Sequence, residues 1–362
     1  MSRTILRYLR RSRWLATVNS LRAYSTFSER LQNELTSRKL PLSFDYLHPQ
    51  PSYLLDLTIA DLFPSTFLSA RTRRALPSST RPLHLPAGHH LVYFPPQVRL
   101  SELLPDGTDI LHAPGSPFNR RLWAGGSIAF SSTNLLLLDG SRAVCFEGIR
   151  DVVVKGPPGE EKIIVKIERR IGAVQEGEEE SDIRERLWNA SEGMGMHSSI
   201  IENRDLVFMR GKTTEQLIQD KAGFSQASRT IKSPFNPEFR YQIIPTKALL
   251  FRFSALTFNA HLIHLDKSYT RDVEGYRNLL VHGPLTLTLL LTALRAHLGG
   301  KGVIIRGIDY RNIAPIYVDE KLTICGKPKS TKDDHVWDVW MEGRDGGLAV
   351  RGTIRVDEYQ SS

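Results

Sequence analysis

Four polar residues whose side chains suit proton transfer lie within eight positions of the C-terminal half: Asn259, His261, His264 and Asp266. The unperturbed pKa of histidine lies near neutrality, so an imidazole beside an amide and a carboxylate suits general acid–base catalysis. On a helix, His261 and His264 would share one face and could also serve a metal ion. No HExxH pattern, carboxylate triad or cysteine pair is nearby, so we expect no metal. The remaining alternative is that these are ordinary polar residues of a loop.

A second feature, the step His282-Gly283-Pro284, lies just before the most apolar stretch of the chain, Leu285–Leu298. We predict that this stretch is a buried helix, because Pro284 fits a first helical turn. The N–H groups of that turn have no intrahelical acceptor, so the Gly283 amide can bind an oxygen on which negative charge develops. His282 is expected to support this turn. The alternative is a plain capped core helix, but two such features in one short window favour catalysis.

The sequence around the polar cluster and the His282-Gly283-Pro284 step predicts one helix among several strands. We predict that a strand, Phe251–Phe258 (FRFSALTF), precedes the polar cluster. Gly299-Gly300 is expected to end the apolar helix, because glycine tolerates left-handed geometry. Further strands are predicted at about 303–312, 319–327, 335–342 and 347–356. A helix followed by an antiparallel meander predicts an α+β fold in which the sheet wraps one face around the helix.

The N-terminal half shows a similar order of elements. A helical stretch, Tyr53–Phe63, is followed by a proline-rich section and then by runs of β-branched residues. Val144–Val154 and Ile163–Ile171 are separated by a ProProGly turn and predict a hairpin.

The length of 362 residues allows two ordinary domains. We expect a leader and connector at 1–45, an N-terminal domain at 46–211, a Ser- and Pro-containing linker at 212–238, and a C-terminal domain at 239–356 that carries the polar cluster.

The N-terminus carries most of the net charge. Residues 1–24 hold six arginines and no acidic residue, so the rest of the chain carries only +3 of the formal +9. This composition is typical of a mitochondrial transit peptide, and we expect cleavage after about Tyr24 and a location in the mitochondrial matrix. The alternatives are a disordered basic tail or a nucleic-acid contact. Basic residues interleaved with aromatics would be needed for the latter, and no such cluster occurs, so we expect no nucleic-acid partner.

Other composition features exclude whole classes of protein. The two cysteines, Cys145 and Cys325, lie far apart, which argues against a disulfide scaffold and a structural zinc site. No run of 18 apolar residues occurs, so we expect no integral membrane segment.

The segment around the polar cluster, TFNAHLIHLD, resembles the hydratase 2 motif of MaoC-like enzymes, Asp-x-Asn-Pro-(Leu/Ile)-His-x-Asp, which is followed downstream by a His-Gly step. Aligned on IHLD, His264 falls on the catalytic histidine and Asp266 on the trailing aspartate. Gly283 falls on the glycine whose amide binds the thioester carbonyl. Asn259 stands where the family has its catalytic aspartate, and Leu262 stands where it has proline. The segment is similar to mesaconyl-thioester hydratases and fungal mitochondrial type 2 hydroxyacyl-thioester dehydratases.

The tract RLWAGGSIAF, Arg121–Phe130, resembles the non-catalytic N-terminal domain of the same subgroup, so the resemblance covers about 46–356. It implies a tandem (double) hot-dog fold, each antiparallel sheet wrapped around a long central helix, as a monomer or homodimer. The implied activity is that of a (3R)-3-hydroxyacyl-thioester dehydratase of mitochondrial fatty-acid synthesis. It needs no cofactor and acts on substrates carried by acyl carrier protein or coenzyme A. His264 would remove the α-proton, the Gly283 amide would stabilise the enolate, and Asn259 would hold the hydroxyl or water.

Two alternatives remain open at this point. One is a hydratase of a short dicarboxylic enoyl-CoA of the mesaconyl or itaconyl type, and the other is a non-catalytic acyl-binding protein, suggested by Asn259. Arg306 and Arg311 are candidates to meet coenzyme A phosphates or an acidic carrier, or are solvated strand residues. Trp123 and Gly125 are candidates to line the thioester channel or to pack a loop. Asp266 is expected to cap or orient the backbone.

Overall fold

The computed structural model describes residues 26–64, 76–188, 197–224, 230–299, 303–330 and 333–358. The expected transit peptide, residues 1–24, lies outside the described residues. Residues 26–36 form a helix, and its Leu31 and Leu35 are buried in the same cluster as residues of the first strands. The region expected to be a connector is thus partly packed onto the N-terminal half. Among the described residues, no helix combines the length and the apolar character needed to cross a bilayer.

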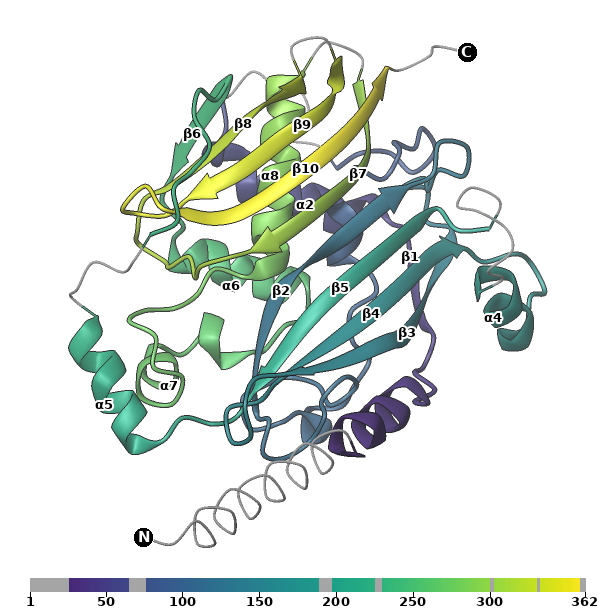
Figure 1. Ribbon diagram of the computed structural model, residues 1–362. Coiled ribbons are helices and arrows are strands. Elements are labelled where there is room, and N and C mark those ends of the chain that lie inside the picture. The colour runs from purple at the N-terminus through teal and green to yellow at the C-terminus, as the bar shows by residue number, and fades with distance from the viewer. Residues whose placement is uncertain are drawn as a thin grey trace, which may run out of the picture.

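Ten strands of the described chain form one antiparallel sheet in the order β1-β3-β4-β5-β2-β7-β10-β9-β8-β6 (Figure 1). The strands of the N-terminal half are β1 (Ser43–Tyr46), β2 (Arg120–Phe130), β3 (Arg142–Lys155), β4 (Lys162–Ala173) and β5 (Ile200–Met209). Those of the C-terminal half are β6 (Phe239–Ile243), β7 (Val303–Asn312), β8 (Leu322–Ser330), β9 (Asp333–Glu342) and β10 (Leu348–Glu358). The halves meet where β2 pairs with β7. The predicted hairpin is confirmed as β3 paired with β4, and the four predicted C-terminal strands are confirmed as β7 to β10. Only β8, β9 and β10 form a meander, because β7 pairs with β10 at its far side and not with β8.

The α-helices are α2 (Pro49–Ile59), α4 (Glu180–Trp188), α5 (Thr214–Gly223), α6 (Lys247–Leu256), α7 (Lys267–Asp272) and α8 (Gly283–His297). Short 3₁₀ turns are η1 (Ala60–Leu62), η2 (His89–Val92), η3 (Leu100–Glu102) and η4 (Leu262–His264). Helix α5 lies within the segment expected to be a linker.

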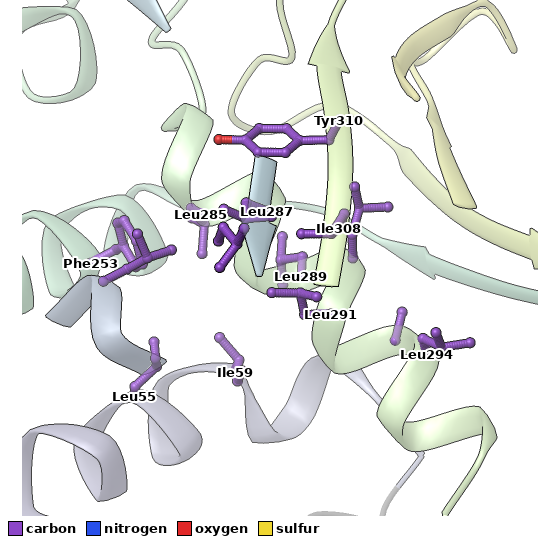
Figure 2. Close-up of a cluster of buried hydrophobic side chains, with 14 of the residues drawn as sticks. Leu55, Ile59, Phe253, Leu285, Leu287, Leu289, Leu291, Leu294, Ile308 and Tyr310 are labelled. Atoms are coloured by element: carbon purple, nitrogen blue, oxygen red, sulfur yellow. The ribbon is translucent and has the colours of Figure 1, made fainter. Parts of the chain in front are cut away.

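Helix α8 is the long central helix of the C-terminal half, as predicted. Every residue from Leu285 to Leu294 is buried, so this stretch of the helix is enclosed on all sides by other elements. Figure 2 shows its leucines among Ile308 and Tyr310 of β7, Phe253 of α6, and side chains of α2. The β-strands of the C-terminal half curve around it (Figure 1).

The N-terminal half departs from the expectation of a long central helix in each half. Its helix α2 has 11 residues, and Leu55 and Ile59 of α2 pack into the cluster around α8 (Figure 2). The apolar face of β3 to β5 is covered instead by residues 26–40 and by irregular chain that includes Leu111 and Phe118. Loops therefore occupy the place expected for a second long helix, which leaves room for a cavity. 

The prediction of a strand at 251–258 was wrong, because most of this segment belongs to helix α6. Thr246 caps the helix by accepting a hydrogen bond from the Leu249 N–H. Leu249, Leu250 and Phe253 are buried while Phe251 is exposed, which is a helical spacing of the apolar residues. The short FRFSALTF pattern fits periods of both 2 and 3.6 residues, and packing against α2 and α8 selects the helix.

Candidate active site

His264 lies in the turn η4 and is buried, with 7% of its surface exposed. Its Nδ1 lies 2.8 Å from the carbonyl oxygen of Leu280. Because a carbonyl only accepts hydrogen bonds, Nδ1 carries the proton and Nε2 keeps its lone pair. Burial lowers the pKa of His264 to about 4, with the Leu280 bond opposing the shift and the charge of Arg121 adding to it. The ring is therefore a neutral base at pH 7.

His282 holds the position of His264. The two rings stack with centroids 3.7 Å apart and planes 25° apart. On its other side, Nε2 of His282 is 2.8 Å from the hydroxyl oxygen of Ser254 in α6. Burial, followed by the charges of His264 and His261, lowers the pKa of His282 well below its usual value, so this ring is also neutral. The stack fixes the plane of His264 against the start of α8.

Gly283 is the first residue of α8, preceded by the N-cap residue His282, whose side chain makes no capping bond. The Gly283 amide thus has neither an intrahelical acceptor nor a side-chain cap. A Cβ at this position would lie 2.7 Å from Cβ of Trp123 and 3.2 Å from Nδ2 of Asn312. Only glycine allows Trp123 of β2 to approach so closely. The neutral base stacks on the His282 ring and the amide follows His282 in the chain, so both lie near the start of α8.

Asn259 and His261 lie at the turn between α6 and η4. The Asn259 side-chain oxygen accepts a hydrogen bond of 2.9 Å from the His261 backbone N–H. Its NH₂ group remains available as a donor, but an amide exchanges no proton at neutral pH. His261 is 4% exposed, and its Nε2 lies 3.6 Å from a carboxylate oxygen of Asp106, in the N-terminal half.

A cavity of about 800 Å³ brings these residues together. Asn259, His261, His264 and Gly283 all line it, and so does Trp123. Most of the rest of the wall is apolar and comes from both halves, including Leu91, Phe94, Leu111, Ile167, Leu206, Ile263 and Ile316. An apolar cavity with a few polar groups at one place is typical of a site for a small ligand with an apolar part.

One wall of the cavity, on the side of the N-terminal half, carries paired charges that the sequence did not indicate. Arg121 pairs with Asp109 at 3.1 Å, and Arg169 pairs with Glu147 and Glu202, each at 3.0 Å. Two further residues extend this network of ion pairs: His112 contacts Glu147 at 2.6 Å, and Arg204 contacts Glu202 at 2.7 Å. Burial alone would raise the pKa of Glu147, but His112 and the arginines outweigh it and hold that pKa at about 2. The carboxylates are therefore charged and neutralise the arginines.

A family model described as hydroxyacyl-thioester dehydratase type 2 matches residues 88–318, more than half of the chain. The chain belongs to this family. The mitochondrial hydroxyacyl-thioester dehydratase type 2 of Schizosaccharomyces pombe is 27% identical over 289 residues, which cover 78% of this chain and 88% of that protein. Mesaconyl-C(4)-CoA hydratase of Chloroflexus aurantiacus is 36% identical over 123 residues, which cover 34% of this chain and 41% of that protein.

A solved structure of a MaoC-like dehydratase from Phytophthora capsici has a TM-score of 0.56 to this chain at 11% identity. The superposition covers 90% of this chain and 97% of that one. Together with the α8-centred sheet, this similarity shows the double hot-dog fold. Membership of the dehydratase family makes this protein a hydro-lyase.

Of the remaining predicted site residues, some lie at or near the cavity and others lie away from it. Trp123 lines the cavity, and Asp266 caps α7 by accepting a hydrogen bond of 2.9 Å from the Tyr269 N–H, as expected of a supporting residue. Arg306 and Arg311 lie on β7 and are not among the cavity-lining residues; Arg306 pairs with Asp357 at 2.7 Å instead. The structure thus gives neither arginine a contact with the cavity.

Gly125 is not among the cavity-lining residues and instead has a structural role. Its φ of 149° and the register shift next to it mark a β-bulge in β2. A Cβ on Gly125 would lie 2.4 Å from the carbonyl oxygen of Tyr310 in β7. Gly125 therefore allows the two halves of the sheet to meet.

Proposed function

We propose that the protein is a (3R)-3-hydroxyacyl-thioester dehydratase that forms trans-2-enoyl thioesters reversibly in the mitochondrial matrix, as a step of type II fatty-acid synthesis. The observation that carries this proposal is that a neutral imidazole, His264, and an uncapped helix-start amide, Gly283, line one largely apolar cavity. The names of its fungal relatives, mitochondrial hydroxyacyl-thioester dehydratases type 2, support the reaction and the location.

The proposed chemistry assigns one role to each of these groups. Nε2 of His264 removes the α-proton, since Nδ1 is engaged by Leu280. The amide of Gly283 binds the thioester oxygen as it gains charge, in the field of the α8 N-terminus. The NH₂ group of Asn259 donates a hydrogen bond to the 3-hydroxyl group or to the water that forms. The apolar part of the cavity takes the acyl chain.

The second candidate is a hydratase of a short dicarboxylic enoyl-CoA, which is supported by the mesaconyl-C(4)-CoA hydratase relative. A second carboxylate in the substrate would need a cation to receive it. The three arginines that line the cavity, Arg121, Arg169 and Arg204, are each paired with a protein carboxylate. A further lining cation, Lys162, is exposed to solvent at the start of β4, so within the described residues no buried arginine or lysine of the cavity wall is left without a carboxylate, which favours a substrate whose chain is uncharged.

Hydration assays with crotonyl, longer enoyl, mesaconyl and itaconyl thioesters test the proposal. We expect turnover of the monocarboxylic substrates and a loss of about 10³-fold or more in His264→Ala, because the only assigned α-base is removed. Activity confined to mesaconyl or itaconyl esters would establish the second candidate. No turnover of any thioester, with binding retained, would indicate an acyl-binding protein. Matched acyl-carrier-protein and coenzyme A substrates identify the carrier, and sedimentation distinguishes a monomer from a homodimer.

A further inference from the structure

The site contains a second buried imidazole beside a carboxylate, and the mechanism above does not use it. Nε2 of His261 lies 3.6 Å from Oδ2 of Asp106 and has no hydrogen-bond partner among the described residues, although the atom is fully buried. A buried polar atom of this kind costs free energy unless the surroundings compensate for it. His261 also lines the cavity. An unpartnered, buried imidazole that faces both a carboxylate and the substrate space is a candidate for proton transfer.

Asp106 is held in place by several contacts with its surroundings. Its Oδ1 accepts hydrogen bonds from the N–H and the hydroxyl group of Thr108, at 2.9 and 2.6 Å. Its carbonyl oxygen accepts a bond of 2.9 Å from Leu262 N–H in the catalytic turn. Next to it, Gly107 approaches so closely that a Cβ would lie 2.1 Å from the carbonyl oxygen of Ala260. The loop that carries Asp106 therefore packs on the turn that carries His261. The second carboxylate oxygen of Asp106, Oδ2, faces the His261 ring.

At position 259, where the related motif has an ionisable aspartate, this chain has an asparagine. Elimination of the 3-hydroxyl group as water requires a proton donor, and Asn259 cannot supply a proton. In the related motif, the aspartate and the asparagine occupy the positions of Asn259 and His261 in this chain. The amide thus stands at the first position, and an ionisable ring stands two residues later. Asp106, from the other half, supplies the carboxylate next to that ring.

We propose that His261 delivers the proton to the departing 3-hydroxyl oxygen, with Asp106 as the positioning residue that orients the ring and balances its transient charge; this rests on the proposed dehydratase function. The C2–H bond breaks first, and its proton goes to Nε2 of His264 while the electron pair moves into the thioester enolate. The proton then passes from His264 to His261, whose rings lie edge to face with centroids 5.6 Å apart. As the C2=C3 bond forms and the C3–O bond breaks, His261 gives this proton to the oxygen. Water leaves, and both rings return to the neutral form.

The electrostatic surroundings suit a transient charge on His261 and not a permanent one. Burial, together with His264 and Arg121, lowers the pKa of His261 well below its usual value, so the resting ring is neutral. A ring that is neutral at rest can accept the proton from His264 and release it readily. The nearby carboxylate makes that brief charge less costly, as it does in other imidazole–carboxylate pairs.

The test separates removal of the α-proton from loss of the hydroxyl group. For His261→Asn, we expect the dehydration rate to fall by about 10²- to 10⁴-fold. Exchange of the α-proton of the 3-hydroxyacyl thioester into D₂O, followed by NMR, should stay within about threefold of wild type, because His264 and Gly283 are intact. His264→Ala should lose both reactions. His297→Asn, at the far end of α8 and outside the cavity lining, is the control for a His→Asn change.

Two further variants complete the test. Asn259→Asp combined with His261→Asn restores an ionisable group at 259 and should recover most of the dehydration lost in the single variant. Asp106→Asn keeps the oxygen that Thr108 uses, and should lower kcat by about tenfold or more with little change in KM.

The proposal is overturned if His261→Asn retains dehydration, if it loses exchange and dehydration equally, or if the double variant recovers nothing. Failure of the proposed function itself is distinguishable, because it would appear as wild-type protein that turns over no 3-hydroxyacyl or enoyl thioester.

Discussion

Substitution of Gly283 by alanine tests whether the close approach of Trp123 sets the position of the α8 amide. The added Cβ would lie 2.7 Å from Cβ of Trp123 and 2.9 Å from its Cγ. Ordinary contacts begin at 3.4 Å, so the helix start or the tryptophan must move by about 0.7 Å. The Cβ of Trp123 belongs to the backbone framework of β2, so rotation of the indole ring cannot relieve this contact.

Both stability and catalysis should change in Gly283→Ala. Overpacking of this size costs about 1–3 kcal/mol of unfolding free energy. A donor displaced by about 0.7 Å leaves the narrow range of distances over which an amide stabilises an oxyanion, and loss of one such donor costs about 10²- to 10³-fold in kcat. We therefore expect kcat for enoyl-thioester hydration to fall by roughly 10²-fold, with a smaller change in KM.

The assay is steady-state hydration of an enoyl thioester, followed by loss of its ultraviolet absorbance, alongside thermal unfolding. Gly223→Ala is the matched control, because Gly223 is a helical glycine of α5 with no atom within 4 Å of the added Cβ. It should leave kcat unchanged and raise stability by at most about 1 kcal/mol. A Gly283→Ala protein with wild-type kcat at temperatures where it is fully folded would refute the role of this amide.

Three other perturbations have expected outcomes. The free energy of unfolding should fall as the pH drops from 6.5 toward 4. In this range His264 binds a proton in the unfolded chain but not in the folded protein, where its pKa is about 4. Chemical denaturation at pH 4 should show a loss of about 3 kcal/mol from this group. Arg306→Ala removes a partly exposed pair with Asp357 and a hydrogen bond of 3.2 Å to the Ser131 carbonyl oxygen, and should leave kcat/KM unchanged, with about 1 kcal/mol lost on thermal unfolding. Asp266→Ala removes the cap of α7 and should lower unfolding free energy by about 1 kcal/mol.

Much of the C-terminal half could be predicted from local patterns. The apolar run that became α8 is bounded by Pro284 and Gly299, which favour the start and the end of a helix, and the strands after it are separated by turn residues. His264 and Gly283 could be chosen as candidates because they belong to short motifs, and both line the cavity. Their neighbours in the sequence are also their neighbours in the site.

Other features were invisible because they depend on contacts between distant parts of the chain. Asp106 lies 155 positions before His261, and no local pattern marks a loop aspartate as the partner of a particular ring. The paired charges of β3 to β5 lie on three adjacent strands, and from the sequence alone they are indistinguishable from a solvated face of the sheet. Arg306 is also an arginine on a strand, like Arg169, but it lies outside the cavity lining. The sequence alone does not show which face of β7 is turned toward the cavity.

The two halves are more dependent on each other than the expected division into non-catalytic and catalytic domains suggests. Trp123 of β2 packs on the helix start that carries the Gly283 amide, and Asn312 of β7 donates a hydrogen bond of 2.9 Å to the Trp123 carbonyl oxygen. The buried pair of Arg120 and Glu274, at 2.7 Å, links β2 to the segment after α7. Breaking such a pair leaves an unpaired buried charge and costs several kcal/mol, which resists separation of the halves. In the proposed mechanism, the N-terminal half therefore acts on the reaction through the geometry that it imposes on the turn of His261 and His264 and on the start of α8.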